Sequence, residues 1–474
     1  MRSATFAALL AIELAAPARL AASPTLPPLE YQRLAHEILR ELIEIDTTHA
    51  HGATRAAEVI AARLQAAGFS SADMQIIGPR PEKGNLIVRY RAAAADPAPR
   101  VKPILFLSHL DVVEARPEDW SVDPFKLTEQ DGYFYGRGTL DIKDEVANLV
   151  TNLIRLKAEG FVPTRDIVVA LTDDEEGGDA NGVAWLLEHH RDLIDSEYVI
   201  NTDAGGGQIV AGKRLRNPVQ TSEKIFATYR LEVTHPGGHS SMPTRDNAIY
   251  RLADGLHKLA RFDFPVELNE TTRGFFTRLA EQESGQMQAD MLAVTRTPAD
   301  LEAAARLSES PLYNATLRTT CVATMLEAGH AVNALPQRAL ATVQCRLLPD
   351  SDPEEVRRRL IQVLGDPEIV VTLINEPLLS PASPVRPDVM EAVEQITSAM
   401  WPGVIVLPVM DVWSTDGAQL RRAGFPVYGV SGVFFDIDDV RAHGRDERIA
   451  VQAFYEGVEF MYRLIQSVIR GQVI

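Results

Sequence analysis

Three short apolar runs in this chain each end in residues that can bind a metal ion. The runs and the residues that follow them are 104–107 with His109, 167–171 with the acidic turn 174–176, and 198–200 with Asp203. Runs of this length and composition predict buried strands of an α/β sheet. Because ligands of open α/β sheets bind beyond the carboxyl ends of the strands, we expect these side chains to gather at one sheet edge. The sequence therefore predicts a metal site there.

Size, composition and charge narrow the class of protein. The chain has 474 residues, which is too long for one hydrophobic core and predicts two domains or a domain with an insertion. Its 46% hydrophobic and 24% charged residues are typical of a globular protein. The formal net charge of −18 disfavours nucleic acid and anionic membranes as partners. After the N-terminal segment no stretch approaches 18 uncharged apolar residues, so we expect no membrane span.

The first residues have the order of a secretory signal peptide. Arg2 precedes an Ala- and Leu-rich stretch, and small residues that suit cleavage follow before position 22. Glu13 interrupts the apolar stretch, so an N-terminal extension of a cytoplasmic protein is the alternative. We interpret residues 1–22 as a signal peptide and predict a periplasmic or secreted protein.

The chain has only two cysteines, Cys321 and Cys345, which is too few for a disulfide framework or a zinc cluster. Each lies in an apolar or β-like run, which favours two buried, reduced side chains. A single bridge between them is the alternative in an exported protein.

The pattern of the chain changes twice and predicts an interrupted domain. Strands alternate with helices in 24–222 and again in 352–474, which predicts a mixed, largely parallel sheet flanked by helices. Between them, the alternation of residues 226–234 predicts an antiparallel sheet with one solvated face. We therefore expect an α/β domain interrupted by an inserted α+β domain at 223–351. The polar segment 262–315 shows no pattern that assigns its structure.

Several polar residues near the predicted sheet edge could serve a metal site. His109 and Asp111 are two apart in extended chain and face the same way, so the carboxylate could fix the ring. Asp141 follows a glycine-rich turn and is either a helix cap or a carboxylate that bridges two ions. In the acidic turn, one glutamate could bind metal while its neighbour takes a proton from a metal-activated water. His443 precedes the last predicted helix.

These residues fall within a series of short motifs. The motifs are Ser108-His109-Leu110-Asp111-Val112-Val113, Trp120 with Asp123-Pro124-Phe125, Asp131-Gly132, Gly136-Arg137-Gly138 with Asp141, Asp174-Glu175-Glu176, Asp203, and His443-Gly444 before Glu447-Arg448-Ile449. In this order, over nearly the whole chain after Pro28, the sequence resembles the M20 family of zinc exopeptidases and amidohydrolases. That family includes glutamate carboxypeptidases, carboxypeptidase S-like enzymes, acetylornithine deacetylases and succinyl-diaminopimelate desuccinylases.

The resemblance implies a centre with two Zn²⁺ ions per subunit. Asp141 would bridge the two ions. His109 and Asp203 would complete the ligands of one ion, and Glu176 and His443 those of the other. All these ligands bind through nitrogen or oxygen, so Co²⁺ or Mn²⁺ are alternative occupants.

The resemblance also implies the remaining catalytic roles. Glu175 would act as general base and then as general acid, and Asp111 would orient His109. In the inserted domain, the segment Gly237-Gly238-His239-Ser240-Ser241-Met242-Pro243 resembles the lid motif of the family. In that motif the histidine, here His239, reaches the active site of a partner subunit and stabilises the oxyanion, which implies a homodimer. Asn333 and Arg346 resemble residues that hold the terminal carboxylate of the substrate.

We therefore predict a zinc-dependent exopeptidase of the carboxypeptidase or dipeptidase type, which hydrolyses an amide bond next to a free carboxylate through a metal-activated water. Deacylation of N-acyl amino acids is the alternative within the family, because the same chemistry serves both substrates. An inactive, metal-binding homologue that acts as a binding protein is the alternative from another class. The length of 262–315 favours the carboxypeptidase S-like branch over the desuccinylases.

Overall fold

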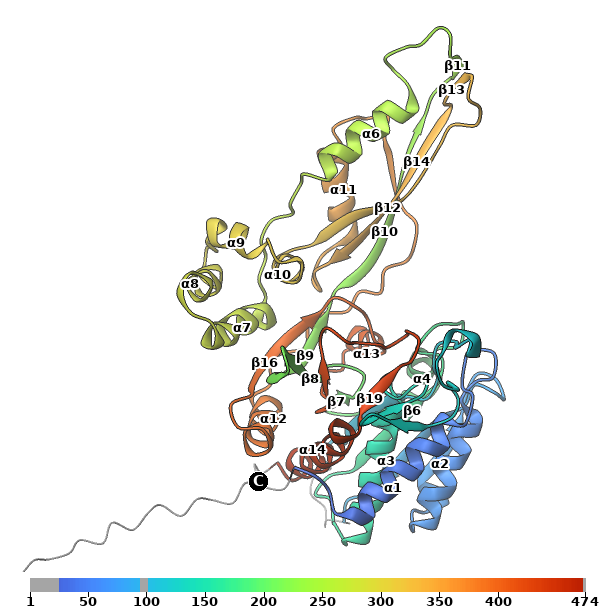
Figure 1. Ribbon diagram of the computed structural model, residues 1–474, viewed down its shortest axis with the longest axis vertical. Coiled ribbons are helices and arrows are strands. Elements are labelled where there is room, and N and C mark those ends of the chain that lie inside the picture. Colours follow the sequence, from blue (N-terminus) through green and yellow to red (C-terminus); the bar gives the residue numbers. More distant parts are fainter. Residues whose placement is uncertain (1–24, 94–100, 472–474) are drawn as a thin grey trace, which may run out of the picture.

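The computed structural model describes residues 25–93 and 101–471. The predicted signal peptide at 1–22 lies outside them. Within these ranges, no helix is long and apolar enough to cross a membrane. Figure 1 shows two parts: a main domain built on a large sheet, and an inserted domain that extends away from it on long strands.

The main domain contains a mixed sheet that confirms the three predicted strands. In spatial order its strands are β1 (Met74–Ile77), β2 (Asn85–Tyr90), β6 (Ile167–Thr172), β3 (Ile104–His109), β7 (Tyr198–Asn201), β17 (Val427–Gly429), β9 (Lys213–Glu223), β8 (Gly207–Val210) and β18 (Phe434–Asp436), with β16 (Ile405–Asp411) beside β9. The strands β6, β3, β7 and β17 are mutually parallel. Their carboxyl ends therefore share one edge of the sheet.

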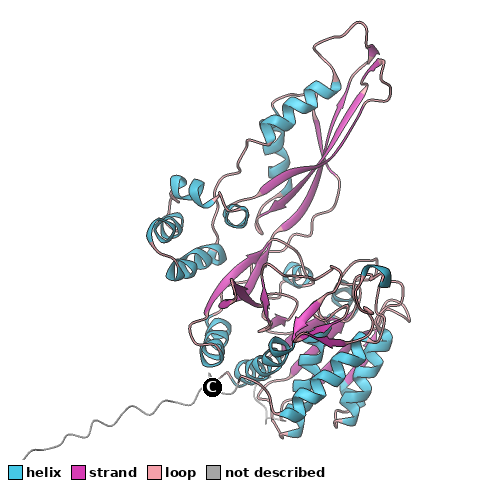
Figure 2. Cartoon of the chain, viewed as in Figure 1, coloured by secondary structure: helices cyan, strands magenta, loops and turns pink. Residues whose placement is uncertain are grey.

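Helices cover both faces of this sheet, as the alternation of helices and strands predicts (Figure 2). The helices on one face are α1 (Leu29–Ile43), α2 (Thr54–Ala66), α3 (Lys143–Ala158), α12 (Pro387–Met400) and α14 (Val451–Arg470); those on the other are α4 (Gly182–His189), α5 (Arg191–Ile194) and α13 (Gly417–Arg422). Successive residues of β3 alternate between the two cores: Ile104 and Phe106 join the first, Leu105 and Leu107 the second. Both faces of the strand are thus buried, which explains its continuous apolar sequence.

Short elements complete the main domain. They are a three-stranded sheet of β19 (Arg448–Ala450), β5 (Tyr133–Tyr135) and β4 (Thr128–Gln130), and the 3₁₀ turns η1 (Ser71–Asp73) and η2 (Pro117–Asp119). Through β19 and β5, the segment that precedes the last helix is paired with the segment that precedes Asp141.

The inserted domain is an antiparallel sheet with helices on one face. Its strands, in spatial order, are β12 (Thr320–Ala328), β14 (Arg338–Leu347), β10 (Ile225–Thr234) and β15 (Val370–Leu373); its helices are α6 (Ala248–Leu259) and α11 (Pro353–Leu364). At the far tip, β11 (Gly238–His239) pairs with β13 (Ala334–Leu335) (Figure 1). Alternate residues of β10 are buried, which confirms its predicted solvated face.

This sheet extends past the boundary that we expected at residue 351. The helix α11 packs against the same sheet, and β15 pairs with β10. The proline-rich break near 350 is thus a turn within the inserted domain, because the helix that follows buries its apolar side on the domain it has just left.

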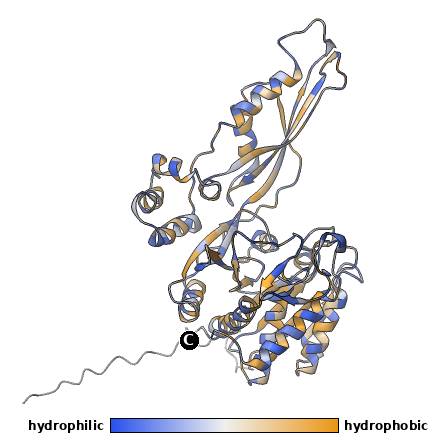
Figure 3. Cartoon of the chain, viewed as in Figure 1, coloured by the Kyte–Doolittle hydropathy of each residue, from blue (hydrophilic) through white to orange (hydrophobic). Residues whose placement is uncertain are grey.

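The segment 262–315 is helical and packs on the main domain. It contains α7 (Glu270–Leu279), η3 (Ala280–Gln282), α8 (Gly285–Val294), α9 (Leu301–Leu307) and α10 (Pro311–Leu317). These helices share a core that includes Leu407 of β16. Apolar and polar residues are mixed along them (Figure 3). Helices of only two or three turns give too few repeats of the helical period to be recognised in the sequence.

The two cysteines form a disulfide, so the favoured interpretation of two reduced side chains is wrong. Cys321 of β12 and Cys345 of β14 are opposite each other in the sheet, and the bond joins them. Both cysteines fit the apolar pattern of their strands, so the pattern alone does not reveal the bond. The two residues are 24 positions apart, and strand register, which brings them opposite each other, cannot be read from the sequence.

The junction between the domains contains a buried ion pair. Glu223, at the end of β9, accepts a hydrogen bond from Arg421 (2.7 Å) and another from the backbone N–H of Thr415 (3.0 Å). The next residue, Lys224, donates through Nζ to the backbone carbonyls of Ala315 and Arg318. The start of the inserted domain is thereby fixed to both the main sheet and the helical segment.

Asp411 at the same junction gives a pH-dependent prediction. Burial raises its pKa to about 7, against the hydrogen bond it accepts from Gln220. The folded protein therefore keeps this proton where the unfolded chain has lost it, and the carboxylate lowers stability as the pH rises from about 4 to about 7. In Asp411→Asn we expect a melting temperature above that of wild type at pH 8, and a smaller difference at pH 5, measured by calorimetry. An equal difference at both pH values would contradict this explanation.

Candidate metal centre

Residues from five distant parts of the chain meet at the carboxyl edge of the main sheet. His109 ends β3, and its Nε2 lies 3.3 Å from Asp141 Oδ1 and 3.8 Å from Asp203 Oδ1. Asp141 precedes α3, and Asp203 follows β7. The predicted convergence of these side chains is thus present in the structure.

A second group shares Asp141. His443 Nε2 lies 3.1 Å from Asp141 Oδ2 and 2.8 Å from Glu176 Oε2. The two oxygens of Asp141 therefore face different histidines, one in each group. This is the geometry expected of a carboxylate between two cation sites, and all five predicted ligands take part in it.

The environment of His109 suits a metal ligand. Its Nδ1 lies 3.0 Å from the backbone carbonyl of Asp111, to which a protonated Nδ1 donates. That tautomer leaves the Nε2 lone pair free. Nε2 is buried and has no hydrogen-bond partner among the described residues. A buried nitrogen lone pair beside two carboxylates is the kind of donor set that a divalent cation satisfies.

Asp111 differs in detail from the expected orienting role. Its carboxylate Oδ1 is 3.6 Å from His109 Nδ1, which is longer than a hydrogen bond. Instead, Oδ1 and Oδ2 accept the backbone N–H groups of Glu175 (3.2 Å) and Glu176 (3.1 Å). The carbonyl of Asp111 thus holds the histidine ring, while its side chain holds the acidic turn.

Glu447 plays the corresponding part for the loop that carries Asp141. Its Oε1 accepts the backbone N–H groups of Gly138 (3.1 Å), Leu140 (2.8 Å) and Asp141 (3.1 Å). Its Oε2 accepts a hydrogen bond from Arg137 (2.5 Å), and both side chains are buried. Arg137 also donates to the carbonyl of Gly444, the residue after His443. One buried ion pair therefore links the Asp141 loop to the His443 loop.

Burial and the neighbouring charges of the cluster change the protonation of the site. Burial raises the pKa of Asp203 to about 7, against the effect of His109. Burial and then the Asp203 carboxylate raise the pKa of Glu175 well above its usual range. Hydrogen bonds to Asp141 and Glu176 raise the pKa of His443 to about 10. Such a cluster binds positive charge, as protons or as metal cations.

The predicted residues of the inserted domain lie in two places. His239 and Asn333 are exposed at the tip, where Ser240 N–H donates to the Asn333 carbonyl (3.1 Å). Arg346 is at the opposite end of the sheet, beside Phe226, with its guanidinium 4.9 Å from the ring centre. Ten residue pairs of β10 and β14 separate these ends, which is about 30 Å at the usual rise per residue. Within one chain, Asn333 and Arg346 cannot hold the same carboxylate.

Three further residues of the site could not be given a role from the sequence: Glu447, which lies in a motif, and Lys83 and His49, which do not. Lys83 Nζ and His49 Nδ1 both contact Asp174, next to the predicted base. The signal available for Glu447 was its place in a motif with His443. Lys83 and His49 have no motif, and only the fold brings them to the acidic turn.

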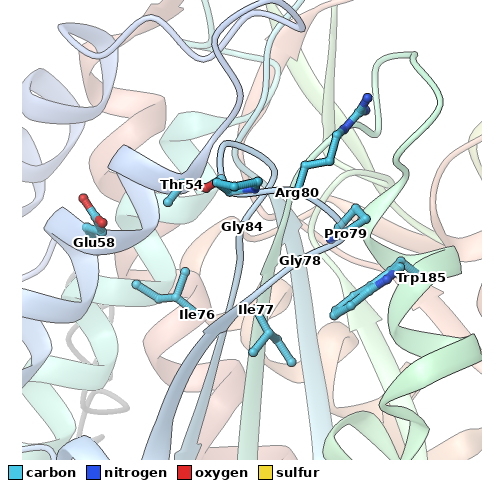
Figure 4. A pocket seen from close by; sticks show the side chains of 10 residues that line it. Thr54, Glu58, Ile76, Ile77, Gly78, Pro79, Arg80, Gly84 and Trp185 are labelled. Atoms are coloured by element: carbon cyan, nitrogen blue, oxygen red, sulfur yellow. The ribbon is translucent and has the colours of Figure 1, made fainter.

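A pocket of about 620 Å³ lies apart from the metal-type cluster. Figure 4 shows it beside the edge strand β1, where Trp185 and Arg80 form part of its wall. None of the predicted site residues lines it. The loop that carries Lys83 forms another part of the wall, through Pro81 and Gly84.

Comparison with known proteins identifies the family of this chain. The model of peptidase family M20/M25/M40 matches residues 105–467. The chain is 29% identical over 384 residues to the N-fatty-acyl-amino acid synthase/hydrolase PM20D1 of Homo sapiens, covering 78% of this chain and 74% of that protein. It is 28% identical over 377 residues to the probable carboxypeptidase S-like 2 of Dictyostelium discoideum, and the match covers 77% of this chain and 72% of that protein.

The fold has solved counterparts. The M20 family metallo-carboxypeptidase Sso-CP2 from Sulfolobus solfataricus aligns with a TM-score of 0.64 at 17% identity, over 91% of this chain and 98% of that one. At this identity the likeness shows the fold alone, a large mixed sheet with flanking helices. With the match of the family model over most of its length, the chain belongs to peptidase family M20/M25/M40 and is a hydrolytic enzyme.

Proposed function

We propose that this enzyme hydrolyses an amide bond next to a free carboxylate, as an exopeptidase of the carboxypeptidase or dipeptidase type that uses two Zn²⁺ ions per subunit. The observation that carries the proposal is the placement of Asp141 between two histidines, with one further carboxylate beside each of them. Hydrolysis of N-acyl amino acids is the second candidate, and the similarity to an N-fatty-acyl-amino acid synthase/hydrolase favours it.

The residues would divide between the two ions as follows. Asp141 would contribute one oxygen to each ion. His109 and Asp203 would complete one set of ligands, and Glu176 and His443 the other. The donors are nitrogen and oxygen only, which suits zinc and is compatible with cobalt or manganese.

Once bound, zinc would acidify a water molecule and polarise the scissile carbonyl. Glu175 lies three residues after the end of β6 and is not in the proposed ligand set. As a carboxylate beside the ligands, it would take a proton from the attacking water and deliver it to the leaving nitrogen. His239 would donate an N–H to the oxygen on which negative charge develops.

Arg346 is suited to bind the carboxylate of the substrate. The guanidinium is about half buried, which lowers its pKa, and within the described ranges no carboxylate pairs with it. Stacking on Phe226 fixes its plane. A half-buried cation without an acidic partner is ready for an anionic ligand, and a planar guanidinium binds a carboxylate through two parallel hydrogen bonds.

The distance between His239 and the base of its own sheet supports a homodimer in which the tip of one chain completes the site of another. The edge strand β12 supports the same arrangement. Its side chains Val322, Met325 and Leu326 are each more than half exposed. An apolar edge strand of this length is usually covered by another chain.

The disulfide between Cys321 and Cys345 supports export to an oxidising compartment, since such bonds are rare in reducing cytosol.

The general base is tested by Glu175→Gln. We expect the variant to bind zinc as wild type does. We expect its kcat to fall at least about 100-fold, because hydrolysis of an amide bond by an activated water depends on a positioned base. Release of amino acids should be measured on panels of dipeptides and of N-acyl amino acids, with metal content determined on the same samples. Hydrolysis of only one panel by the wild-type enzyme would decide between the two substrate classes. If the wild-type protein releases no amino acid from either panel, the result would favour the alternative that it is a binding protein.

The role of Glu447 is tested by Glu447→Gln. The change leaves the buried Arg137 without its counter-charge, so we expect the free energy of unfolding to fall by about 3 kcal/mol. We also expect the zinc content to fall, because the amide keeps only one acceptor oxygen, so the N–H groups of the Asp141 loop and Arg137 can no longer both be paired. Glu459→Gln is the matched control, since Glu459 forms a buried pair with Arg155 between α3 and α14. It should lose stability and keep zinc. Equal zinc loss in both variants would argue against a specific role of Glu447.

Subunit complementation tests the partner role of His239. His239→Ala and Glu175→Gln should each be inactive alone. After subunit exchange, half of the dimers are mixed, and each mixed dimer has one intact site, so about a quarter of wild-type activity should return. A mixture of Glu175→Gln with Glu176→Gln should regain none, because both defects lie on the same side of the composite site. No recovery in the first mixture, with mixed dimers demonstrated, would exclude the shared site.

A further inference from the structure

Three buried carboxylates meet behind the acidic turn. Oxygens of Asp111, Asp173 and Asp174 lie within 4.8 Å of one another, and each side chain is at most 3% exposed. Like charges this close repel strongly in a medium from which water is excluded. The cluster therefore needs a positive charge to keep its shape.

Lys83 supplies that charge. Its Nζ lies 2.5 Å from Asp174 Oδ1 and 3.6 Å from Asp173 Oδ1, and the side chain is 2% exposed. On the solvent side, His49 Nδ1 contacts the same oxygen of Asp174 at 2.7 Å. The ammonium group thus takes the place that a metal ion would occupy among these oxygens, so we do not assign a third ion to the cluster.

The neutralised cluster determines the path of the acidic turn. Asp174 has a left-handed backbone (φ 63°), and its Oδ2 accepts the N–H of Ala180 (2.9 Å), which folds the turn back on itself. Asp111 accepts the N–H groups of Glu175 and Glu176, as described above. Two of the three carboxylates beside Lys83 therefore bind the segment that carries the proposed base and one proposed zinc ligand.

Lys83 is itself held in place by a close-packed loop. Thr54 donates its N–H to the carbonyl of Glu82 (3.2 Å) and its hydroxyl to the carbonyl of Pro81 (2.7 Å). A Cβ at Gly78 would lie 1.7 Å from the carbonyl oxygen of Lys83, so the loop can approach only a glycine there. Figure 4 shows this loop between Gly78 and Gly84, with the Arg80 side chain extending away from the strands; its guanidinium pairs with Asp179. The backbone of the loop is therefore fixed, and it holds the Lys83 ammonium group in one position beside the carboxylates.

We propose that Lys83 is a positioning residue for catalysis: by neutralising Asp173 and Asp174 it sets the acidic turn so that Glu176 faces His443 and Glu175 faces the space beside His109 and Asp203. The proposal rests on the zinc centre proposed above. It adds a residue that lies outside the motifs quoted above.

The test compares two variants of the same loop. Lys83→Met removes the buried charge, and Arg80→Met removes a charge of the same sign whose partner, Asp179, is on the surface. Zinc titration of the chelator-treated proteins by calorimetry measures each site directly. In Lys83→Met we expect one of two zinc sites to weaken at least tenfold and kcat to fall while KM changes less than threefold. Arg80→Met should behave as wild type.

The double variant Lys83→Met/Asp174→Asn separates positioning from simple loss of structure. It removes one charge of each sign and keeps an acceptor oxygen at position 174, so it should fold and regain most of the zinc affinity. A Lys83→Met protein with wild-type zinc affinity and kcat would overturn the proposal, and so would a double variant that fails to fold or binds zinc no better than Lys83→Met. Absence of zinc binding in wild type would instead overturn the proposed centre.

Discussion

The buried pair of Glu447 and Arg137 is the interaction on which the geometry of the site depends most. One oxygen of Glu447 gathers three backbone N–H groups of the loop that carries Asp141, and the other binds Arg137. Arg137 in turn holds the carbonyl beside His443. Two segments more than 300 residues apart are thereby joined a few ångströms from the metal-type cluster. Removing one partner leaves a buried charge without compensation, so we expect a change of either residue to displace the two loops that carry Asp141 and His443.

Buried carboxylates that bind loop backbone also occur on the other side of the cluster. Asp111 gathers the N–H groups of Glu175 and Glu176, and Lys83 balances the charge of the carboxylates around it. On both sides of the cluster, buried carboxylates accept the backbone N–H groups of a loop, and a buried cation pairs with a carboxylate there: Arg137 with Glu447, and Lys83 with Asp174. Loops that carry catalytic groups are otherwise the mobile parts of α/β folds. Here their positions are determined by charge pairs within the rigid sheet edge and the helices next to it.

Much of this arrangement could be predicted from the sequence, and the reasons for the failures are physical. Apolar runs such as 104–107 identify strands buried on both faces, and the rule for ligand sites in α/β sheets then places His109 and Asp203 together. The disulfide between Cys321 and Cys345 was misjudged because strand register is not a local property. The helices of 262–315 are too short to show a period. Lys83 was missed because a single lysine after a turn looks like any solvated charge, and only tertiary contacts distinguish it.

The central claim is that five side chains from distant segments hold a pair of cations around one shared carboxylate. Anomalous diffraction at the zinc absorption edge, from crystals of the zinc-loaded enzyme, measures this most directly. The account predicts two peaks about 3.5 Å apart on either side of Asp141, one beside His109 and the other beside His443. A single peak, or peaks that do not contact Asp141, would contradict it.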